Sequence, residues 1–498
     1  MNPVSSRPWR LLALAALRVT PAASATAQAT PSATSGAGAA TDTIALSLDD
    51  VLRTVIGRSQ EARLARSEIG IADQQVRAAR SAALPTLSGA INYTRTYETP
   101  FRGGGFTLPD SMRFEPDSTA ALADRVRYLE RNAGNAGLGG FGALFSNLPF
   151  GQLNTYVATL TASQTLYAAG KVGAALRIAE QYKGATQNGV TEQLAELELR
   201  TRTAYVRAQL AQELERIATL AVAQADSFLA QERLRLETGL ASELDVLRAE
   251  VAAENLRPDL VQARNAAAVA TLDLKALLDI APETPLRLTT ALDAPAAAVR
   301  AADAAASAED LSDRPALKAA ERTVLIRREQ LRIARAGHLP TVNLRVNYGK
   351  QAFPQTVFGF DGVTWRNDFN AVVGIQIPIF SGFRVDAEAE QAKVALAQEE
   401  LRLTQLREGV ALQYTQAVGE RERAAASLAA RERTVSQATR VHDLTVLRYE
   451  QGLATQLEVS DARLGLLRAR TALAQATADY HLAAAAVVRA RGETTVSF

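Results

Sequence analysis

The residue types that most often do chemistry are scarce in this chain of 498 residues. It has no cysteine, which excludes disulfides, thiolate metal sites and cysteine nucleophiles. Its three histidines, His338, His442 and His481, are far apart and lack the HxH or HxxxH spacing of a metal site. We therefore expect no metal site, no cofactor and no catalytic centre, and we interpret the histidines as surface or packing residues.

Two breaks interrupt otherwise helical sequence at a repeated motif. "ETGLASELDVLRAE" begins at Glu237 and "EQGLATQLEVSDAR" begins at Glu450, and both contain a Gly-Leu-Ala step. Glycine ends helices because it adopts the left-handed backbone conformation without strain. The motif predicts that one long helix ends at Gly239 and another at Gly452, and that a returning helix follows each.

The bulk composition favours long helices. Aromatic residues make up only 5% of the chain, and alanine, leucine, glutamate, glutamine and arginine dominate. The 55 basic and 53 acidic residues nearly balance, so no strong net charge recruits nucleic acid. We expect a mainly α-helical fold with a small β part.

The N-terminus has the pattern of an export signal. Arg7 and Arg10 precede the apolar run "LLALAAL", and small residues follow as far as Ala29. We expect a signal peptide over 1–29 and a linker over 30–45. Without cysteine the protein would not be a lipoprotein. No other segment has the ~18 apolar residues of a membrane helix, so any membrane crossing must use strands.

The remaining sequence reads as two copies of one unit. "ARSAALPTL" from Ala79 matches "ARAGHLPTV" from Ala334, and "LYAAGKVGAALRIAE" from Leu166 parallels "IFSGFRVDAEAEQAK" from Ile379. These motifs keep their order and nearly their spacing. We predict a first repeat over 46–281, an irregular segment over 282–311, a second repeat over 312–492 and a tail over 493–498.

Each repeat is expected to contain two strands after a helix that ends at Leu-Pro. Period-two alternation predicts strands near 86–96 and 154–167, and near 341–349 and 368–380. Val342, Leu344 and Val346, for example, alternate with Asn343, Arg345 and Asn347. This pattern is typical of a barrel wall with its apolar face outward and its polar face toward a lumen. Four strands cannot close a barrel, so several chains would share one.

The long helices carry a thin apolar stripe suited to coiled-coil packing. Val190, Leu194 and Leu197 illustrate it in the first repeat, and Val441, Leu444 and Leu447 illustrate it in the second. A helix of roughly 65 residues would extend about 100 Å. Helices near 48–83 and 313–337 would supplement the shorter returning helices near 243–280 and 456–490. The glycine-rich insert over 97–152 is expected to be a flexible external loop.

These features together resemble the TolC-type outer-membrane efflux proteins, over about residues 46–492. The resemblance rests on "LSLDDVL" from Leu46, the Leu-Pro motifs, the "IPIFSGFRVDAEAEQAK" junction from Ile377 and the paired Gly-Leu-Ala steps. It implies a homotrimer in the outer membrane of a Gram-negative bacterium, with a twelve-stranded β-barrel and an α-helical periplasmic tunnel. Such a protein is a passive conduit rather than an enzyme, and its partners are a periplasmic adaptor, an inner-membrane pump and outer-membrane lipid.

Two alternatives remain at this point. A periplasmic adaptor also contains a long helical hairpin, but it would have one hairpin beside a β-rich domain. A soluble helical enzyme would need a convergent set of catalytic residues. Two tandem hairpins with barrel strands favour the channel of a tripartite efflux pump or a type I secretion system.

The resemblance also implies roles for residues at the two Gly-Leu-Ala steps. Glu458 and Asp461 would give a trimer six carboxylates at its pore entrance, where neighbouring like charges raise some pKa values and attract cations. The candidate latch residues are Arg235, Asp245, Arg448 and Tyr449, although Asp245 could equally be an ordinary helix-start acid. Ala454 stands where the best-known member has a latch arginine. The candidate adaptor-docking residues are Gly239, Leu240, Ala241, Gly452, Leu453 and Ala454.

Overall fold

The computed structural model describes residues 44–98, 114–146, 152–292 and 308–492. The predicted signal peptide, nearly all of the predicted linker, the tail and parts of the insert and of the inter-repeat segment lie outside these ranges. The described chain is mostly helical and has one four-stranded sheet. Within these ranges no helix combines the length and the apolar character that crossing a membrane requires.

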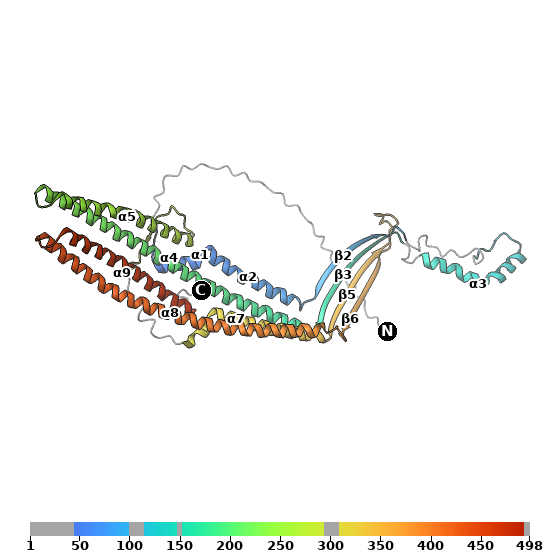
Figure 1. Cartoon of the computed structure of the whole chain (residues 1–498). Coiled ribbons are helices and arrows are strands. Elements are labelled where there is room, and N and C mark those ends of the chain that lie inside the picture. The colour runs from blue at the N-terminus through green and yellow to red at the C-terminus, as the bar shows by residue number, and fades with distance from the viewer. Residues whose placement is uncertain (1–43, 99–113, 147–151, 293–307, 493–498) are drawn as a thin grey trace, which may run out of the picture. The chain divides into compact units, whose positions relative to one another are not determined.

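Two long helical hairpins dominate the fold. Helices α4 (Lys171–Glu237) and α8 (Arg384–Glu450) each have 67 residues, which corresponds to about 100 Å at ~1.5 Å per residue. Helix α5 (Glu243–Leu277) returns along α4, and α9 (Gln456–Arg491) returns along α8. The turns of the two hairpins lie side by side at one end of the helical part (Figure 1).

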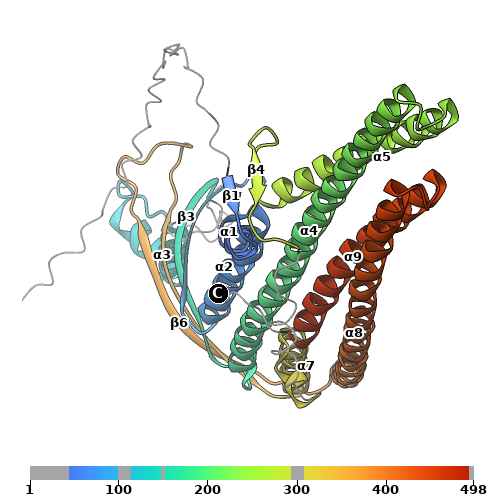
Figure 2. The same cartoon turned by 90° about the vertical axis from the view of Figure 1, so that its left-hand side faces the viewer.

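The hairpins form a row because α9 also packs against α4. The order of neighbours is therefore α5, α4, α9 and α8, as the two views show (Figures 1 and 2). Beyond the ends of the returning helices, α2 (Gln60–Ser81) packs on α4, and α7 (Pro315–Arg335) packs between α4 and α8.

The prediction of a single helix over 48–83 is wrong. This segment is divided into two helices, α1 (Leu48–Arg58) and α2. Ser59 between them has an extended backbone, with ψ of 151°, and its side chain accepts a hydrogen bond from the backbone N–H of Ala62. Serine is a favoured N-cap because its hydroxyl satisfies an N–H that the first turn of a helix leaves free. Ser59 therefore starts a new helix.

The sheet has the strand order β2, β3, β5, β6, and all neighbours are antiparallel. The strands are β2 (Thr86–Arg95), β3 (Asn154–Tyr167), β5 (Thr341–Ala352) and β6 (Arg366–Gln376). Strand β6 ends four residues before the predicted boundary near 380, and the next residues are Ile377 and Pro378. Proline has no N–H to donate to a neighbouring strand, which explains the early end.

Two segments that were expected to be irregular contain regular structure. Helix α3 (Leu122–Ser146) lies inside the insert that we interpreted as a loop. Its first twelve residues contain no glycine or proline, which favours a helix. Strand β4 (Leu286–Leu288) lies in the inter-repeat segment and pairs in parallel with β1 (Ile44–Leu46). Two short 3-10 helices, η3 (Ala308–Asp313) and η4 (Ala336–His338), flank α7.

The two predicted helix stripes differ in burial. Val190, Leu194 and Leu197 on α4 are 2–3% exposed and pack in a core with α1, α2 and the end of α5. In contrast, Val441, Leu444 and Leu447 on α8 are 49–56% exposed. The second stripe is therefore not buried within one chain.

Candidate functional site

The turn of each hairpin is built by the glycine of its Gly-Leu-Ala step. Gly239 and Gly452 both have a φ of +74°, a left-handed conformation that favours glycine. The N–H of Leu240 donates to the carbonyl of Arg235 at 2.7 Å, and that of Leu453 donates to the carbonyl of Arg448 at 2.8 Å. These bonds close the last helical turn in both hairpins.

A capping box starts the returning helix after each turn. Ser242 caps α5 and Thr455 caps α9, and each side chain accepts a hydrogen bond from the N–H three residues later. The carboxylates of Asp245 and Glu458 in turn accept from the N–H groups of Ser242 and Thr455, at 3.0 and 2.6 Å. Such reciprocal bonds satisfy two N–H groups that a helix start leaves free.

The capping boxes favour the ionised form of these two acids. Hydrogen bonds from Ser242 hold the pKa of Asp245 below its usual range, and those from Thr455 do the same for Glu458. Of the two roles left open for Asp245, the structure displays the helix-start role. In a single chain the pKa of Glu458 is lowered, whereas the resemblance implied that neighbouring acids in a trimer would raise some pKa values.

Tyr449 at the end of α8 contacts α4 through a buried acid. Its hydroxyl donates a hydrogen bond of 2.9 Å to Oε1 of Glu232, whose side chain is 1% exposed. The Arg235 guanidinium lies 4.6 Å above the Tyr449 ring and 3.9 Å from Glu232. Burial, and then the hydrogen bond to Glu232, raise the pKa of Tyr449 to about 12. The hydroxyl therefore stays protonated and remains a donor at physiological pH.

A second polar contact joins the two returning helices. Gln456 at the start of α9 donates from Nε2 to the backbone carbonyl of Asp245 on α5 at 2.7 Å, and its side chain is buried. The Arg463 guanidinium on α9 lies 4.6 Å over the ring of Phe228 on α4. All four helices then share one apolar cluster, which contains Phe228, Leu229, Ala249 and Val459, with Val246, Val446 and Tyr449 packed against it.

The candidate latch residues thus have partners that the sequence did not indicate. Tyr449 and Asp245 do not bond to each other, because Tyr449 bonds to Glu232 and the Asp245 carboxylate bonds to Ser242. Arg448 donates from Nη2 to the carbonyl of Leu453 at 3.1 Å and so helps to close its own turn. Ala454 is half-buried in that turn.

Sequence reasoning missed Glu232, Gln456, Phe228 and Arg463. For Glu232 a signal existed, because the buried positions Ala221, Ala225, Phe228 and Leu229 continue at helical spacing to residue 232. A carboxylate at that position would have been identified as a buried acid in need of a partner. Gln456 directly follows a cap residue, and nothing in its local sequence marks it.

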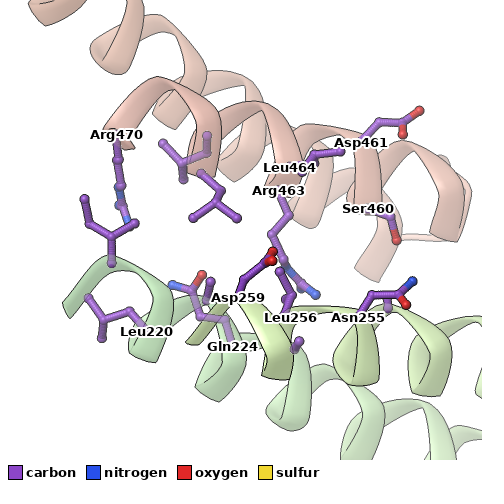
Figure 3. Close-up of a pocket in the computed structure, with 16 residues that line it drawn as sticks. Leu220, Gln224, Asn255, Leu256, Asp259, Ser460, Asp461, Arg463, Leu464 and Arg470 are labelled. Carbon is purple, nitrogen blue, oxygen red and sulfur yellow. The ribbon is translucent and has the colours of Figure 1, made fainter. Parts of the chain in front are cut away.

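A hollow of about 330 Å³ lies just behind these contacts, between α4, α5 and α9. Leu256, Asn255 and Asp259 of α5 line one side, and Arg463 reaches across from α9 (Figure 3). Burial lowers the pKa of the Arg463 guanidinium. Asp461 also borders the hollow, but its carboxylate points away from it (Figure 3) and is exposed. Glu458 is exposed as well.

The three histidines lie in separate surroundings. His338 is 3.4 Å from Asp386, His442 is 3.2 Å from Asp443, and the Nε2 of His481 is 3.1 Å from the carbonyl of Leu292. Across the described ranges, no group of three or more histidine and acidic side chains could hold a metal ion.

Comparison with known proteins identifies the family. The family model described as "Outer membrane efflux protein" matches residues 130–279 and 306–493. The chain belongs to this outer membrane efflux protein family. The match supports the channel interpretation over the periplasmic adaptor that we considered as the alternative.

Relatives of this outer membrane efflux protein agree with the assignment. It is 28% identical to Protein CyaE of Bordetella pertussis over 340 residues, which are 68% of this chain and 70% of that protein. It is 27% identical to the outer membrane efflux protein BepC of Brucella suis over 267 residues, 53% of this chain and 56% of that protein. The crystal structure of CusC has the same fold, with a TM-score of 0.69, 19% identity and coverage of 93% of this chain and 96% of CusC.

Family and fold are thus those of outer-membrane channel proteins and not those of enzymes. This outer membrane efflux protein acts in export across the outer membrane. The paired helix ends, with their contacts between α4 and α8 and between α5 and α9, are its candidate gate.

Proposed function

We propose that three copies of the chain form one channel from the periplasm to the exterior, with a shared twelve-stranded barrel and a helical tunnel. The observation that carries this proposal is the state of the two edge strands. Every residue of β2 and of β6 is exposed, and neither strand has a second neighbour among the described elements. Long exposed edges pair readily with another strand, so β6 of one chain would pair with β2 of the next.

The outer helices of the row support the same arrangement. α5 and α8 lie at the two ends of the row, and both carry large apolar side chains that are half or more exposed. If α8 of a neighbouring chain packed against α5, the apolar side chains of both helices would be buried. Their exposure in the single chain is what such an interface predicts. These side chains are Leu244, Leu247, Val251 and Val261 on α5, and Val394, Leu401, Leu412, Val441 and Leu447 on α8.

In such a trimer the helix tips would form the periplasmic entrance. Glu458 and Asp461 would contribute six carboxylates, and the exposed position of both in the single chain is compatible with this role. The contacts from Tyr449 to Glu232 and from Gln456 to Asp245 hold the two hairpins of one chain together. We propose that opening separates the hairpins by breaking these two contacts.

The exposed turns would receive a periplasmic adaptor, which in turn links the channel to an inner-membrane pump. Leu240 is 71% exposed and Leu453 is 64% exposed, and each follows a turn glycine with a φ of +74°. The flanking residues are Gly239, Ala241, Gly452 and Ala454. Changing Leu240 or Leu453 to glutamate should abolish adaptor-dependent export while trimers persist, and normal export would contradict docking at these turns.

Because the chain has no cysteine, pairs of introduced cysteines can test the trimer directly. A cysteine at Ser88 in β2 would be combined in turn with one at Asn370, Val372 or Gly374 in β6. Oxidation of outer membranes should yield covalent trimers for at least one pair. The control pair joins Ser88 and Thr161, which are direct neighbours within one chain, and should yield only cross-linked monomer. A soluble monomer, or an absence of covalent trimer in all three pairs, would contradict the proposal.

A further inference from the structure

One face of the sheet is mostly polar in its helix-proximal half, with Val372 as its one large apolar residue. Strand register places Arg345 of β5 directly opposite Ser163 of β3 and Val372 of β6, so all three share a face. The other residues of this face are small and uncharged: Thr86, Ser88, Thr161, Thr165, Asn343, Asn347, Asn370 and Gly374. Arg345 is the one charged residue within this set.

This arginine lies in a hollow, and none of the acids in the described ranges pairs with it. The hollow has a volume of about 820 Å³ and is lined by Arg345, Asn347, Ser163 and residues around them. Among the described residues, no carboxylate lies within ion-pair distance of Arg345, and its side chain is exposed. The acid of the same face is Asp368, opposite Gly349, which is four residues further along β5. At ~3.3 Å per residue that is about 13 Å away.

We propose that Arg345 from three chains forms an anion-binding constriction inside the barrel, a ligand site for multivalent inorganic anions such as polyphosphates. The inference rests on the proposed trimeric channel, which sets the three arginines at one level. Side chains fill the interior of an eight-stranded barrel, whereas a sixteen-stranded barrel leaves an open aqueous channel. The interior of a twelve-stranded barrel has an intermediate width. Long side chains at one level therefore narrow it. Rings of arginine or lysine are a known means of selecting anions in pores.

The chemistry of arginine suits this ligand class. A guanidinium is always charged, and its planar set of N–H donors binds phosphate oxygens in pairs. Beside it, the Thr161 hydroxyl donates to Oδ1 of Asn347 at 3.0 Å and Nδ2 of Asn347 donates to Oδ1 of Asn370 at 2.9 Å, which leaves the second Asn347 N–H as a further donor. The ring is opposite in sign to the carboxylates of Glu458 and Asp461 at the helix tips, so a solute from the periplasm would meet those acids before it meets the arginines.

The test uses wild-type trimers in planar lipid bilayers, with inorganic tripolyphosphate added on the side of the barrel. We expect a concentration-dependent block of single-channel current. Arg345→Gln should raise the half-blocking concentration at least tenfold and shift the reversal potential in a KCl gradient toward cations. Arg345→Lys should retain most of the block.

The matched control is Lys350→Gln. Lys350 lies on the same strand and the change removes the same charge, but its register partners Ala158 and Asn367 place it on the opposite face of the sheet. It should leave the block unchanged. Equal block in wild type and Arg345→Gln, or equal loss in both glutamine variants, would overturn the arginine ring while leaving the channel intact. Wild-type trimers that conduct no current would overturn the proposed channel, and the ring with it.

Discussion

Tyr449 and Glu232 join the two hairpins of one chain across 217 residues of sequence, with a hydrogen bond of 2.9 Å from the tyrosine hydroxyl to the acid. Glu232 is almost fully buried, and its second oxygen, Oε2, has no hydrogen-bond partner within the described structure. A buried carboxylate that loses its donor is costly because it gives up solvation without compensation. The pair is therefore the contact whose removal should most weaken the association of the two hairpins at their tips.

Tyr449→Phe is expected to favour open tips. A hydrogen bond to a charged group contributes about 1.5–3 kcal/mol, which corresponds to a roughly ten- to hundredfold shift in the ratio of closed to open channels. Single-channel recordings measure that ratio directly. Tyr182→Phe is the matched control, because Tyr182 lies on α4 and its ring is 43% exposed. Glu232→Gln retains an acceptor and should open the tips less; equal open fractions in wild type and Tyr449→Phe would rule out the latch.

The ionisation of Tyr449 should be displaced to high pH. Its folded pKa of about 12 lies above the ordinary value of 10.0, so its contribution to stability is complete below pH 10 and is lost as the pH rises toward 12. Absorbance titration near 295 nm, taken as the difference between wild type and Tyr449→Phe, should display one phenol that ionises near pH 12. A difference curve centred at pH 10 would mean that Tyr449 is solvated and does not bond to Glu232.

The two capping boxes should weaken together in acid. The pKa of Asp245 and that of Glu458 are both lowered on folding, so both acids stabilise their helix starts above the unfolded values of 3.8 and 4.5. That stabilisation is lost as the pH falls through the lower folded pKa values. Hydrogen exchange at the first amides of α5 and α9, corrected for intrinsic rates, should accelerate below pH 4 and not between pH 5 and 7.

Variants can separate the capping boxes from general acid effects. Ser242→Ala and Thr455→Ala should each destabilise the local helix start by about 1 kcal/mol at neutral pH. Glu243→Gln removes an acid from the same first turn of α5 without removing a capping bond, and should change exchange little. Exchange that accelerates equally in Glu243→Gln would show that general charge, rather than the box, protects these amides.

The acids of the proposed entrance should bind divalent cations in the trimer. Glu458→Gln combined with Asp461→Asn removes six negative charges per trimer, and glutamine still supports a capping box. The half-blocking concentration of Mg²⁺ added at the periplasmic side should rise about tenfold or more, because the electrostatic attraction is lost. Glu450→Gln, an exposed acid at the end of α8, is the control for net charge. Unchanged block in the double variant would exclude these acids from the pore.

Much of this fold could be predicted from the sequence by rules that involve only neighbouring residues. Gly239 and Gly452 end their helices because glycine tolerates the left-handed conformation, and Ser242 and Thr455 restart them through bonds to residues three positions away. The alternation around Arg345 and Asn347 assigns each strand face because side-chain direction in a strand has a period of two. The glycine-rich composition of the insert misled the prediction because it hid a stretch without glycine or proline, in which α3 begins.

By itself, then, the sequence determined the helix ends at Gly239 and Gly452, the strand faces and the resemblance to a channel family, since each depends on neighbours within a few residues or on repeated motifs. Only the tertiary structure decided that Tyr449 bonds to Glu232, that Gln456 joins α9 to α5, and that the stripe at Val441 stays exposed. Those outcomes depend on which helices are adjacent in space. Residues on opposite hairpins meet through packing, and no local pattern in either segment encodes the partner.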